Sequence, residues 1–210
     1  MESIDKLYWR YATKKFDAIK KLTNVQLEVL KNAFNLTATS YGLQPLKLLV
    51  INNKDVQNSL KPFAYNQSQV VDCSHLLVIC IRTDINANYV DARFDLEKEI
   101  RGTSEEVISN FRSFLKKTID SQSAESIEKS AVNQAYITLG NLMTICAFEE
   151  IDSCPMEGFI PQKFDETLNL ATKNLKSILL LPVGFRASDD PMSNLKKVRS
   201  SLDDTIISID

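Results

Sequence analysis

Glycine is scarce in this chain of 210 residues, which removes two common ways of holding a phosphate. The five glycines are Gly42, Gly102, Gly140, Gly158 and Gly184. Neither a G-x-G-x-x-G nor a G-x-x-x-x-G-K-[ST] motif can be assembled from these positions, so the dinucleotide fingerprint and the P-loop are both excluded. A phosphorylated ligand would have to be held by side-chain cations and isolated backbone amides.

The chain also lacks a basic excess and a long apolar run. Its formal net charge is −2 and its pI is near 5.6, which argues against general binding to nucleic acid or anionic membranes. No apolar run approaches the roughly 18 residues that span a membrane. The start "MESIDKLYWR" has no apolar core behind its charges, unlike a secretory signal. We therefore expect a cytoplasmic protein without nucleic-acid or membrane partners.

Residues that bind metals are few. The cysteines Cys73, Cys80, Cys146 and Cys154 form no C-x-x-C pair, and the single histidine, His75, fits no zinc spacing with them. Reduced, mostly buried thiols in a cytosolic protein explain the cysteines better. We expect no metal site and a structural role for the histidine.

Short apolar strands alternate with helices along the chain. Helices are expected from Thr23, where Gln26 completes a capping box, and after a second cap of Thr103 with Glu106. The full set of expected helices is 23–37, 54–61, 88–100, 104–120, 124–149 and 161–171. Strands are expected at 46–52, 75–82, 177–185 and, at the carboxy terminus, 205–209. This alternation, without repeats or a linker, predicts one α+β domain over residues 1–210.

The helix expected at 124–149 is apolar on nearly every side from Ala131 onward. A helix of this kind is buried on most sides, and in a domain of this size complete burial favours a second subunit. Gly140 in its middle costs about 1 kcal/mol relative to alanine. Close approach of another helix would compensate for this cost, and a tolerated weak point is the alternative.

Cationic and amide side chains stand near element boundaries in three groups far apart in sequence. These are Arg10 and Lys14 within "RYATKKFD", then Asn66 and Gln69, then Lys196, Lys197 and Arg199. Arginine and lysine together suit a phosphate when no glycine loop supplies amides. Taken alone, each group is explained better as surface charge than as a ligand site.

Five segments in order resemble the nitroreductase family of FMN-dependent, oxygen-insensitive NAD(P)H oxidoreductases, including its dihydropteridine reductase-like members. They are "RYATKKFD", "TSYGLQPLKLLVI", "YNQSQVVDCSHLLV", "YITLGNLMTICAFEEIDSCPMEGF" and "LPVG…LKKVRSSL", and together they cover essentially the whole chain. The resemblance implies a small central mixed sheet flanked by helices. It also implies an intertwined homodimer with FMN at two sites between the subunits, the carboxy-terminal strand reaching onto the partner's sheet.

The resemblance assigns the FMN phosphate and the flavin edge to particular residues. Arg10, Lys197 and Arg199 would bind the phosphate, and Ala12 stands where the family commonly has a serine. Lys14 would lie near the pyrimidine edge of the flavin, where an ammonium stabilises the negative charge of the reduced ring. Asn66 would donate a hydrogen bond to the same edge. Gln69 replaces a second lysine of close relatives, so we expect a lower flavin reduction potential.

The remaining assignments concern the ring and the substrate. Glu157 and Gly158 would bring backbone to flavin N5. The segment "ATSYG" of the other subunit would line the ribityl chain and ring through Ala38, Thr39, Ser40 and Gly42. The expected substrate contacts are the aromatic residues Tyr41, Phe63, Phe111 and Phe114.

The function implied is ping-pong transfer of hydride from NAD(P)H to flavin and on to nitroaromatic, quinone or similar acceptors. The cofactor carries this chemistry, so no catalytic side chain is assigned. Two alternatives stay open: a relative with another reaction, such as dehydrogenation or flavin modification, and a non-redox dimer that binds a nucleotide or anion. The sequence does not distinguish NADH from NADPH, and it does not identify the acceptor.

Overall fold

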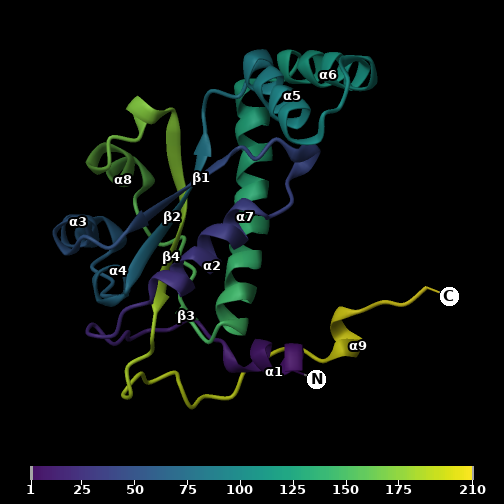
Figure 1. The fold of residues 1–210 in the computed structure, drawn as a ribbon. Coiled ribbons are helices and arrows are strands. Elements are labelled where there is room, and N and C mark those ends of the chain that lie inside the picture. Colours follow the sequence, from purple (N-terminus) through teal and green to yellow (C-terminus); the bar gives the residue numbers. More distant parts are fainter. Residues whose placement is uncertain (1, 210) are drawn as a thin grey trace.

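A four-stranded sheet lies between two groups of helices in the computed structural model, which describes residues 2–209 (Figure 1). In spatial order the strands are β1 (Leu46–Ile51), β2 (His75–Arg82), β4 (Leu175–Gly184) and β3 (Asp152–Ser153). Neighbouring strands pair antiparallel, and a single parallel bridge joins Ala12 to Ser153. The expected α+β class and the expected strands at 46–52, 75–82 and 177–185 are confirmed.

Helices connect and cover the strands. The longer ones are α1 (Glu2–Trp9), α2 (Asn24–Asn35), α5 (Ala87–Arg101), α6 (Glu105–Asp120) and α7 (Ala124–Phe148). The shorter ones are α3 (Lys54–Leu60), α4 (Gln69–Asp72), α8 (Pro161–Thr167) and α9 (Leu202–Thr205). Three 3₁₀ turns complete the set: η1 (Ser40–Gly42), η2 (Lys61–Ala64) and η3 (Ala171–Lys173).

The central strand β2 is apolar throughout because both faces of the sheet are covered. Leu77 and Ile79 belong to the core cluster that includes residues of α2 and α7. Leu76 and Val78, which point to the opposite face, pack in a second cluster with residues of α3, α4 and α8. One cluster therefore lies on each face of the sheet, and the fold has three layers: helices, sheet and helices.

Helix ends follow local capping chemistry with two corrections to the expectations. Thr23 and Gln26 form the expected capping box of α2. The residue that caps α6 is Ser104 and not Thr103, because Ser104 has the extended backbone of an N-cap position. Helix α8 ends at Thr167, short of the expected 171, because Asn169 takes a left-handed backbone with φ +52°. The two-residue strand β3 was not expected, because two residues are too few to show a periodic pattern.

Helix α7 buries one stripe and leaves another face open. Its buried stripe includes Ala135, Leu139 and Leu142, whereas Tyr136 and Ile137 are 45% and 53% exposed. Most of the helix from Ala131 onward is buried or half-buried, as expected, but its burial is incomplete within one protomer. A Cβ atom built at Gly140 would meet no atom within 4 Å, so no described residue of the protomer makes the close approach considered above.

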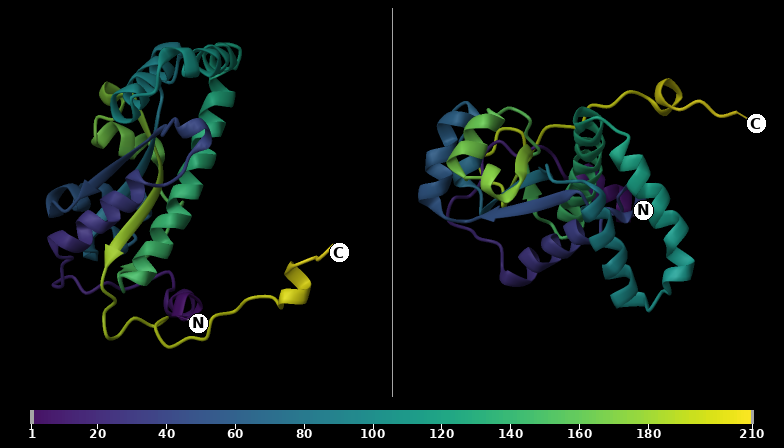
Figure 2. Two further views of the ribbon diagram at one scale, coloured as in Figure 1. Left: turned by 45° about the vertical axis from the view of Figure 1, so that its right-hand side comes forward. Right: turned by 90° about the horizontal axis from the view of Figure 1, so that it is seen from above.

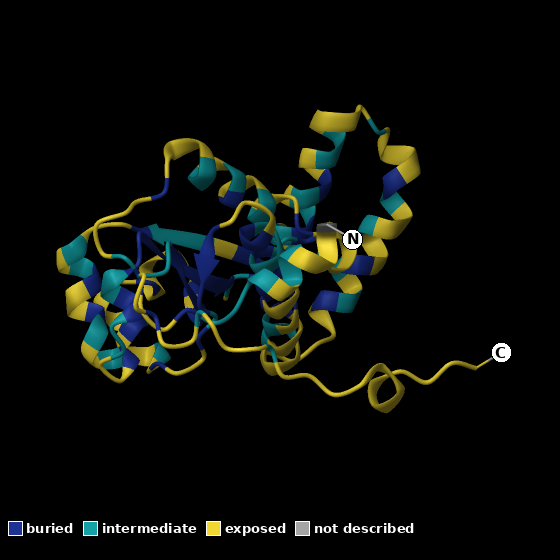
Figure 3. Ribbon diagram, turned by 90° about the horizontal axis from the view of Figure 1, so that it is seen from below, coloured by how far each residue is buried: buried dark blue, intermediate teal, exposed yellow. Residues whose placement is uncertain are grey.

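The carboxy-terminal segment leaves the body of the domain (Figure 2). Residues 206–209 follow α9 without pairing to a strand, so the strand expected at 205–209 is wrong for the protomer. The apolar side chains of Ile206, Ile207 and Ile209 are exposed, and the whole segment is coloured as exposed in Figure 3. A strand cannot form there without a neighbour to supply hydrogen bonds.

All four cysteines are buried and free, as expected for reduced thiols. Within residues 2–209, no helix is long and apolar enough to cross a membrane.

We expect His75 to make the stability of the fold depend on pH near 6.5. It is the single histidine of the chain, so no other imidazole titrates in that range. Its Nδ1 lies 2.9 Å from Ser74 Oγ, which also accepts the Leu22 amide at 2.8 Å. Burial lowers the pKa of His75, and the charges of Lys21 and Lys54 lower it further. The folded state therefore binds the proton less readily than the unfolded chain does. We expect stability to fall as the pH drops below about 6.5, the pKa of unfolded histidine.

Urea unfolding between pH 5 and 8 tests this expectation. In a His75→Gln variant, the free energy of unfolding should no longer fall between pH 7 and 5. The decrease at lower pH, which comes from other titrating groups, should remain. An identical slope in both proteins across that window would contradict the assignment.

Candidate functional site

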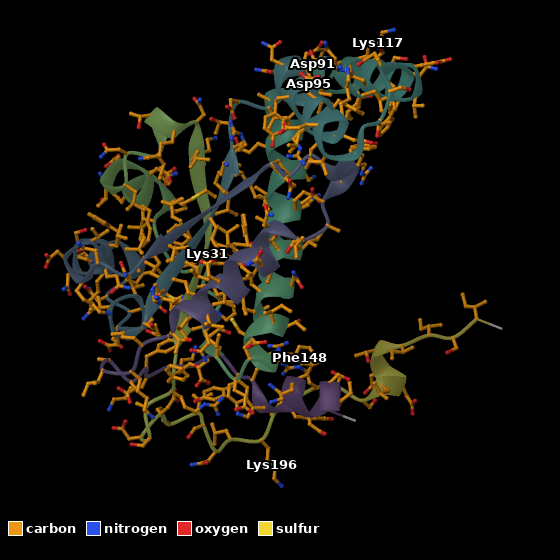
Figure 4. The ribbon with its side chains drawn as sticks, in the orientation of Figure 1. Lys31, Asp91, Asp95, Lys117, Phe148 and Lys196 are labelled. Carbon is orange, nitrogen blue, oxygen red and sulfur yellow. The ribbon has the colours of Figure 1, made fainter. Side chains whose placement is uncertain are left out.

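A cavity of about 650 Å³ lies where the segment after α1 meets the loop after β3 and the carboxy-terminal segment. Five of its lining residues are cationic: Arg10, Lys14, Lys196, Lys197 and Arg199. Figure 4 shows that Lys196 extends away from the body of the domain. The cationic residues at 10–14 and at 196–199, far apart in sequence, thus line one cavity, which we call the cationic cavity.

The cations of this cavity are not neutralised. Among the residues the structure describes, no ion pair involves any of the five. Lys197 donates from Nζ to the Arg10 carbonyl, and Arg10 Nε is buried without a hydrogen-bond partner. Burial lowers the pKa of Lys197, and the charges of Arg10 and Arg199 lower it further. An anion in this cavity would relieve the repulsion and satisfy the unpaired donor.

The backbone around Lys14 is held from two sides. The amides of Lys14 and Lys15 both donate to Asp190 Oδ2, at 2.8 and 2.9 Å. The Thr13 amide donates to the Ser153 carbonyl at 3.2 Å. The segment is therefore fixed between β3 and the 186–190 loop. The other cation of "KK", Lys15, pairs with Asp189 at the surface and does not line the cavity.

Arg186 contacts both neighbours of Arg10 and pairs with Asp152, and we call this set of contacts the Arg186 clasp. The Arg186 guanidinium lies 4.3 Å from the ring centroid of Trp9 and 4.5 Å from that of Tyr11. Its Nε donates to Asp152 Oδ1 at 2.7 Å, and its backbone amide donates to Oδ2 at 2.7 Å. Burial raises the pKa of Tyr11 to about 12, so the phenol stays neutral at physiological pH. The clasp ties the Arg10 segment to β3 and β4.

The "PMEGF" loop lies next to the cationic cavity and contacts the 61–67 segment. Pro155 lines the cavity, two residues before Glu157. The Gly158 carbonyl accepts from Gln67 Nε2 at 2.9 Å, and the Ile160 amide donates to the Phe63 carbonyl at 2.8 Å. The structure thus brings Glu157 and Gly158 beside the segment that carries Phe63 and Asn66.

Helix α7 contributes a residue that the sequence did not single out. Tyr136 donates from its hydroxyl to Glu157 Oε1 at 2.7 Å, and this hydrogen bond raises the pKa of Tyr136. Met143, two helical turns further along the same helix, lines the cationic cavity. One face of α7 therefore runs along both the loop and the cavity.

The segment "ATSYG" lies elsewhere in the protomer. The Ser40 amide donates to Gln134 Oε1 at 2.9 Å, near the middle of α7. Gln134 precedes Met143 by nine residues, a rise of roughly 14 Å along a helix. Figure 1 shows α5 and α6 at one end of α7, and α1 with the carboxy-terminal segment at the other. In one protomer, the "ATSYG" segment is therefore separated from the cationic cavity.

The expected residues divide as follows. The cationic cavity is lined by Arg10, Ala12, Lys14, Lys197 and Arg199. The adjacent loop contact carries Phe63, Asn66, Glu157 and Gly158. The distant part carries Ala38, Thr39, Ser40, Tyr41, Gly42, Phe111 and Phe114, where the rings of Tyr41 and Phe111 are 6.0 Å apart and those of Phe111 and Phe114 are 6.2 Å apart. Gln69 begins α4 and is buried.

Five residues with a positioning role were not found from the sequence. They are Gln67, Tyr136, Asp152, Arg186 and Asp190. Each acts through a partner distant in sequence, so no local spacing marks it. The available signal was their place in the recognised segments: Gln67, Tyr136 and Asp152 lie within them, and Arg186 follows "LPVG" by two residues.

Comparison with known proteins identifies the family of the chain. The nitroreductase family model matches residues 7–185. A Staphylococcus epidermidis protein named as a candidate NAD(P)H nitroreductase is 31% identical over 211 residues, covering 97% of this chain and 94% of the relative.

Solved structures show the same fold at lower identity. A candidate nitroreductase of Bacillus subtilis superposes with a TM-score of 0.87 at 16% identity and covers 99% of both chains. A candidate nitroreductase of Exiguobacterium sibiricum, solved in complex with FMN, gives a TM-score of 0.84 at 18% identity and covers 100% of this chain and 98% of its own. The chain belongs to the nitroreductase family.

Proposed function

We propose that the protein is an FMN-dependent NAD(P)H oxidoreductase acting on nitroaromatic, quinone or similar acceptors. The observation that carries the proposal is the cationic cavity, whose five cations lack carboxylate partners among the described residues. Family membership and the FMN-containing relative support it.

The residues present fit the phosphate of FMN. Arg10 offers a buried Nε donor without a partner, and Lys197 carries a charge that burial and neighbouring cations disfavour. A phosphate dianion would accept from both and offset the repulsion among Arg10, Lys197 and Arg199. Ala12 supplies no hydroxyl, so the cations carry the phosphate contact.

The ring system would extend from the cationic cavity toward the "PMEGF" loop. Lys14 lines the cavity and would face the pyrimidine edge with Asn66. The Tyr136 hydroxyl holds the Glu157 carboxylate, which leaves the backbone of Glu157 and Gly158 to meet the ring. When bound, FMN would supply the two-electron chemistry of hydride transfer between NAD(P)H and an acceptor.

A second copy of the chain would complete the site. The "ATSYG" part does not line the cationic cavity of its own protomer, and the open face of α7 exposes the apolar surface of Tyr136 and Ile137. A homodimer through this face would place the partner's "ATSYG" against the flavin and give the exposed carboxy-terminal segment a surface to cover.

Visible spectroscopy of the purified protein tests the proposal. We expect a yellow protein that releases FMN on denaturation and bleaches when NADH or NADPH is added without oxygen. A protein that takes up no FMN would overturn the proposal in favour of non-redox anion binding. A yellow protein that neither nicotinamide bleaches would favour another reaction on this fold.

A further inference from the structure

A second cavity, of about 430 Å³, lies between η1, α5 and α6 and shares no lining residue with the cationic cavity. Its volume falls in the range typical of small-molecule sites, roughly 300–1,000 Å³. We call it the α5–α6 cavity. Tyr41 and Phe111, two of the expected substrate contacts, line it, but the assignments above give no role to its charged residues.

One wall of the α5–α6 cavity is aromatic. The rings of Phe94 and Phe111 meet edge to face with centroids 5.7 Å apart, and the ring of Tyr41 lies 6.0 Å from Phe111. These rings come from α5, α6 and η1, so three elements present one apolar surface to a ligand. Leu96 and Ile100 add aliphatic surface from α5.

Ion pairs away from this wall hold α5 and α6 together. Arg112 Nε on α6 lies 2.7 Å from Asp91 Oδ1, and Arg112 Nη2 lies 2.8 Å from Asp95 Oδ1. Figure 4 labels Asp91 and Asp95 on α5, beside α6. The helix pair that supplies most of the cavity lining is therefore held by its own ion pairs.

The charged residues of the cavity recur every four positions on one face of α5: Arg93, Glu97 and Arg101. Arg101 Nη1 pairs with Glu97 Oε1 at 3.1 Å, so these two charges offset one another. Arg93 forms no ion pair with any residue in 2–209. Its Nη2 donates to the Gly42 carbonyl at 3.2 Å, and its Nε is buried without a partner. The cavity thus carries one uncompensated positive charge beside an aromatic wall.

We propose that the α5–α6 cavity binds an aromatic carboxylic acid, with Arg93 as the ligand of the carboxylate. The guanidinium fork matches the two oxygens of a carboxylate, and arginine stays charged at all physiological pH values. The aromatic body of the acid would pack against Tyr41, Phe94 and Phe111 in offset or edge geometry. A single unpaired cation suits a monoanion, whereas a phosphate dianion would find its second charge unmatched.

The inference deepens the proposed function, on which it rests. Tyr41 and Gly42 line this cavity and also belong to the segment assigned to the flavin of the partner subunit. An acid held by Arg93 would therefore lie near the place where the acceptor is reduced. The acceptors this chain prefers would then be aromatic nitro compounds or quinones that carry a carboxylate.

Calorimetric titration of the holoprotein with 2-naphthoate, which cannot be reduced at a nitro or quinone group, tests the binding site. We expect 2-naphthoate to bind at least about tenfold more tightly than the neutral 2-naphthamide, as a charge-assisted pair requires. Arg93→Met should abolish that preference, and Arg93→Lys should retain part of it. Lys98→Met removes a cation from the same helix outside the cavity, where Lys98 pairs with Glu105, and should change nothing.

Equal binding of acid and amide, or an Arg93→Met variant that keeps the preference, would overturn the proposal. Reduction kinetics supply the second test: kcat/KM for 4-nitrobenzoate should exceed that for 4-nitrobenzamide, and Arg93→Met should remove the difference. The two failures are distinguishable. An enzyme that reduces both compounds equally well refutes only this inference, whereas a protein that binds 2-naphthoate through Arg93 but takes up no FMN refutes only the proposed function.

Discussion

An Arg10→Ala variant should lose FMN while keeping its fold. Arg10 brings a buried, unpartnered Nε to the cationic cavity, and no described carboxylate competes for its charge. A hydrogen bond to a charged group contributes about 1.5–3 kcal/mol, so the dissociation constant of FMN should rise roughly 10- to 150-fold. Lys197→Ala should act in the same direction, because Lys197 shares the cavity and bonds to the Arg10 carbonyl.

Quenching of flavin fluorescence during titration of the apoprotein measures this effect. Riboflavin serves as the matched ligand, since it lacks the phosphate and should bind the variants and the parent equally. Lys15→Ala serves as the matched variant: it removes a cation from the same "KK" pair, but Lys15 pairs with Asp189 at the surface. A loss of riboflavin affinity as large as that of FMN would show that the variants disturb the ring site, and it would refute the phosphate assignment.

The cationic cavity shows which parts of a binding site can be predicted from a single sequence and which cannot. Taken alone, the cations of "RYATKKFD" and "KKVR" are explained better as surface charge, because charge density does not say which side chains converge. The absence of glycine loops left side-chain cations as the way to hold a phosphate, and the order of five segments then selected Arg10, Lys197 and Arg199. The structure places all three in one cavity.

The elements were predictable where a periodic pattern was long enough. The strand at His75–Arg82 and the capping box at Thr23 follow from burial on two faces and from local hydrogen bonding. The failures have a common cause, which is dependence on partners distant in sequence. The two residues of β3 form a strand only because β4 passes beside them, and the apolar end "TIISI" has no strand to pair with in the protomer.

The supporting contacts of the site could not be predicted for the same reason. Asp190 reaches the amides of Lys14 and Lys15 across more than 170 positions of sequence, and Tyr136 reaches Glu157 from another element. A carboxylate that accepts backbone amides in a loop has no sequence signature. Arg93 was not singled out from the sequence either, because a charged helix face carries no local signal for the α5–α6 cavity that this residue lines.

An Asp152→Asn variant should lose more stability than any surface charge change. Asp152 is 4% exposed, and it receives both the Nε and the backbone amide of Arg186, whose side chain is 24% exposed between Trp9 and Tyr11. Removing one partner of a fully buried ion pair costs about 3–5 kcal/mol. Because Arg186 retains some contact with water, we expect a smaller loss of about 2–3 kcal/mol in the free energy of unfolding, or roughly 5–10 °C in Tm.

The same substitution should also weaken FMN binding, although Asp152 does not line the cationic cavity. The clasp of Arg186 holds Trp9 and Tyr11, the two neighbours of Arg10, so loosening it lets the Arg10 segment move relative to β3. Chemical unfolding at a fixed protein concentration measures the first effect, and flavin titration measures the second. Asp189→Asn is the matched control, since it breaks an exposed pair worth at most about 1 kcal/mol. Equal losses in the two variants would mean that the clasp adds no more than a surface ion pair, and that the Arg10 segment is held by Asp190 and Ser153 alone.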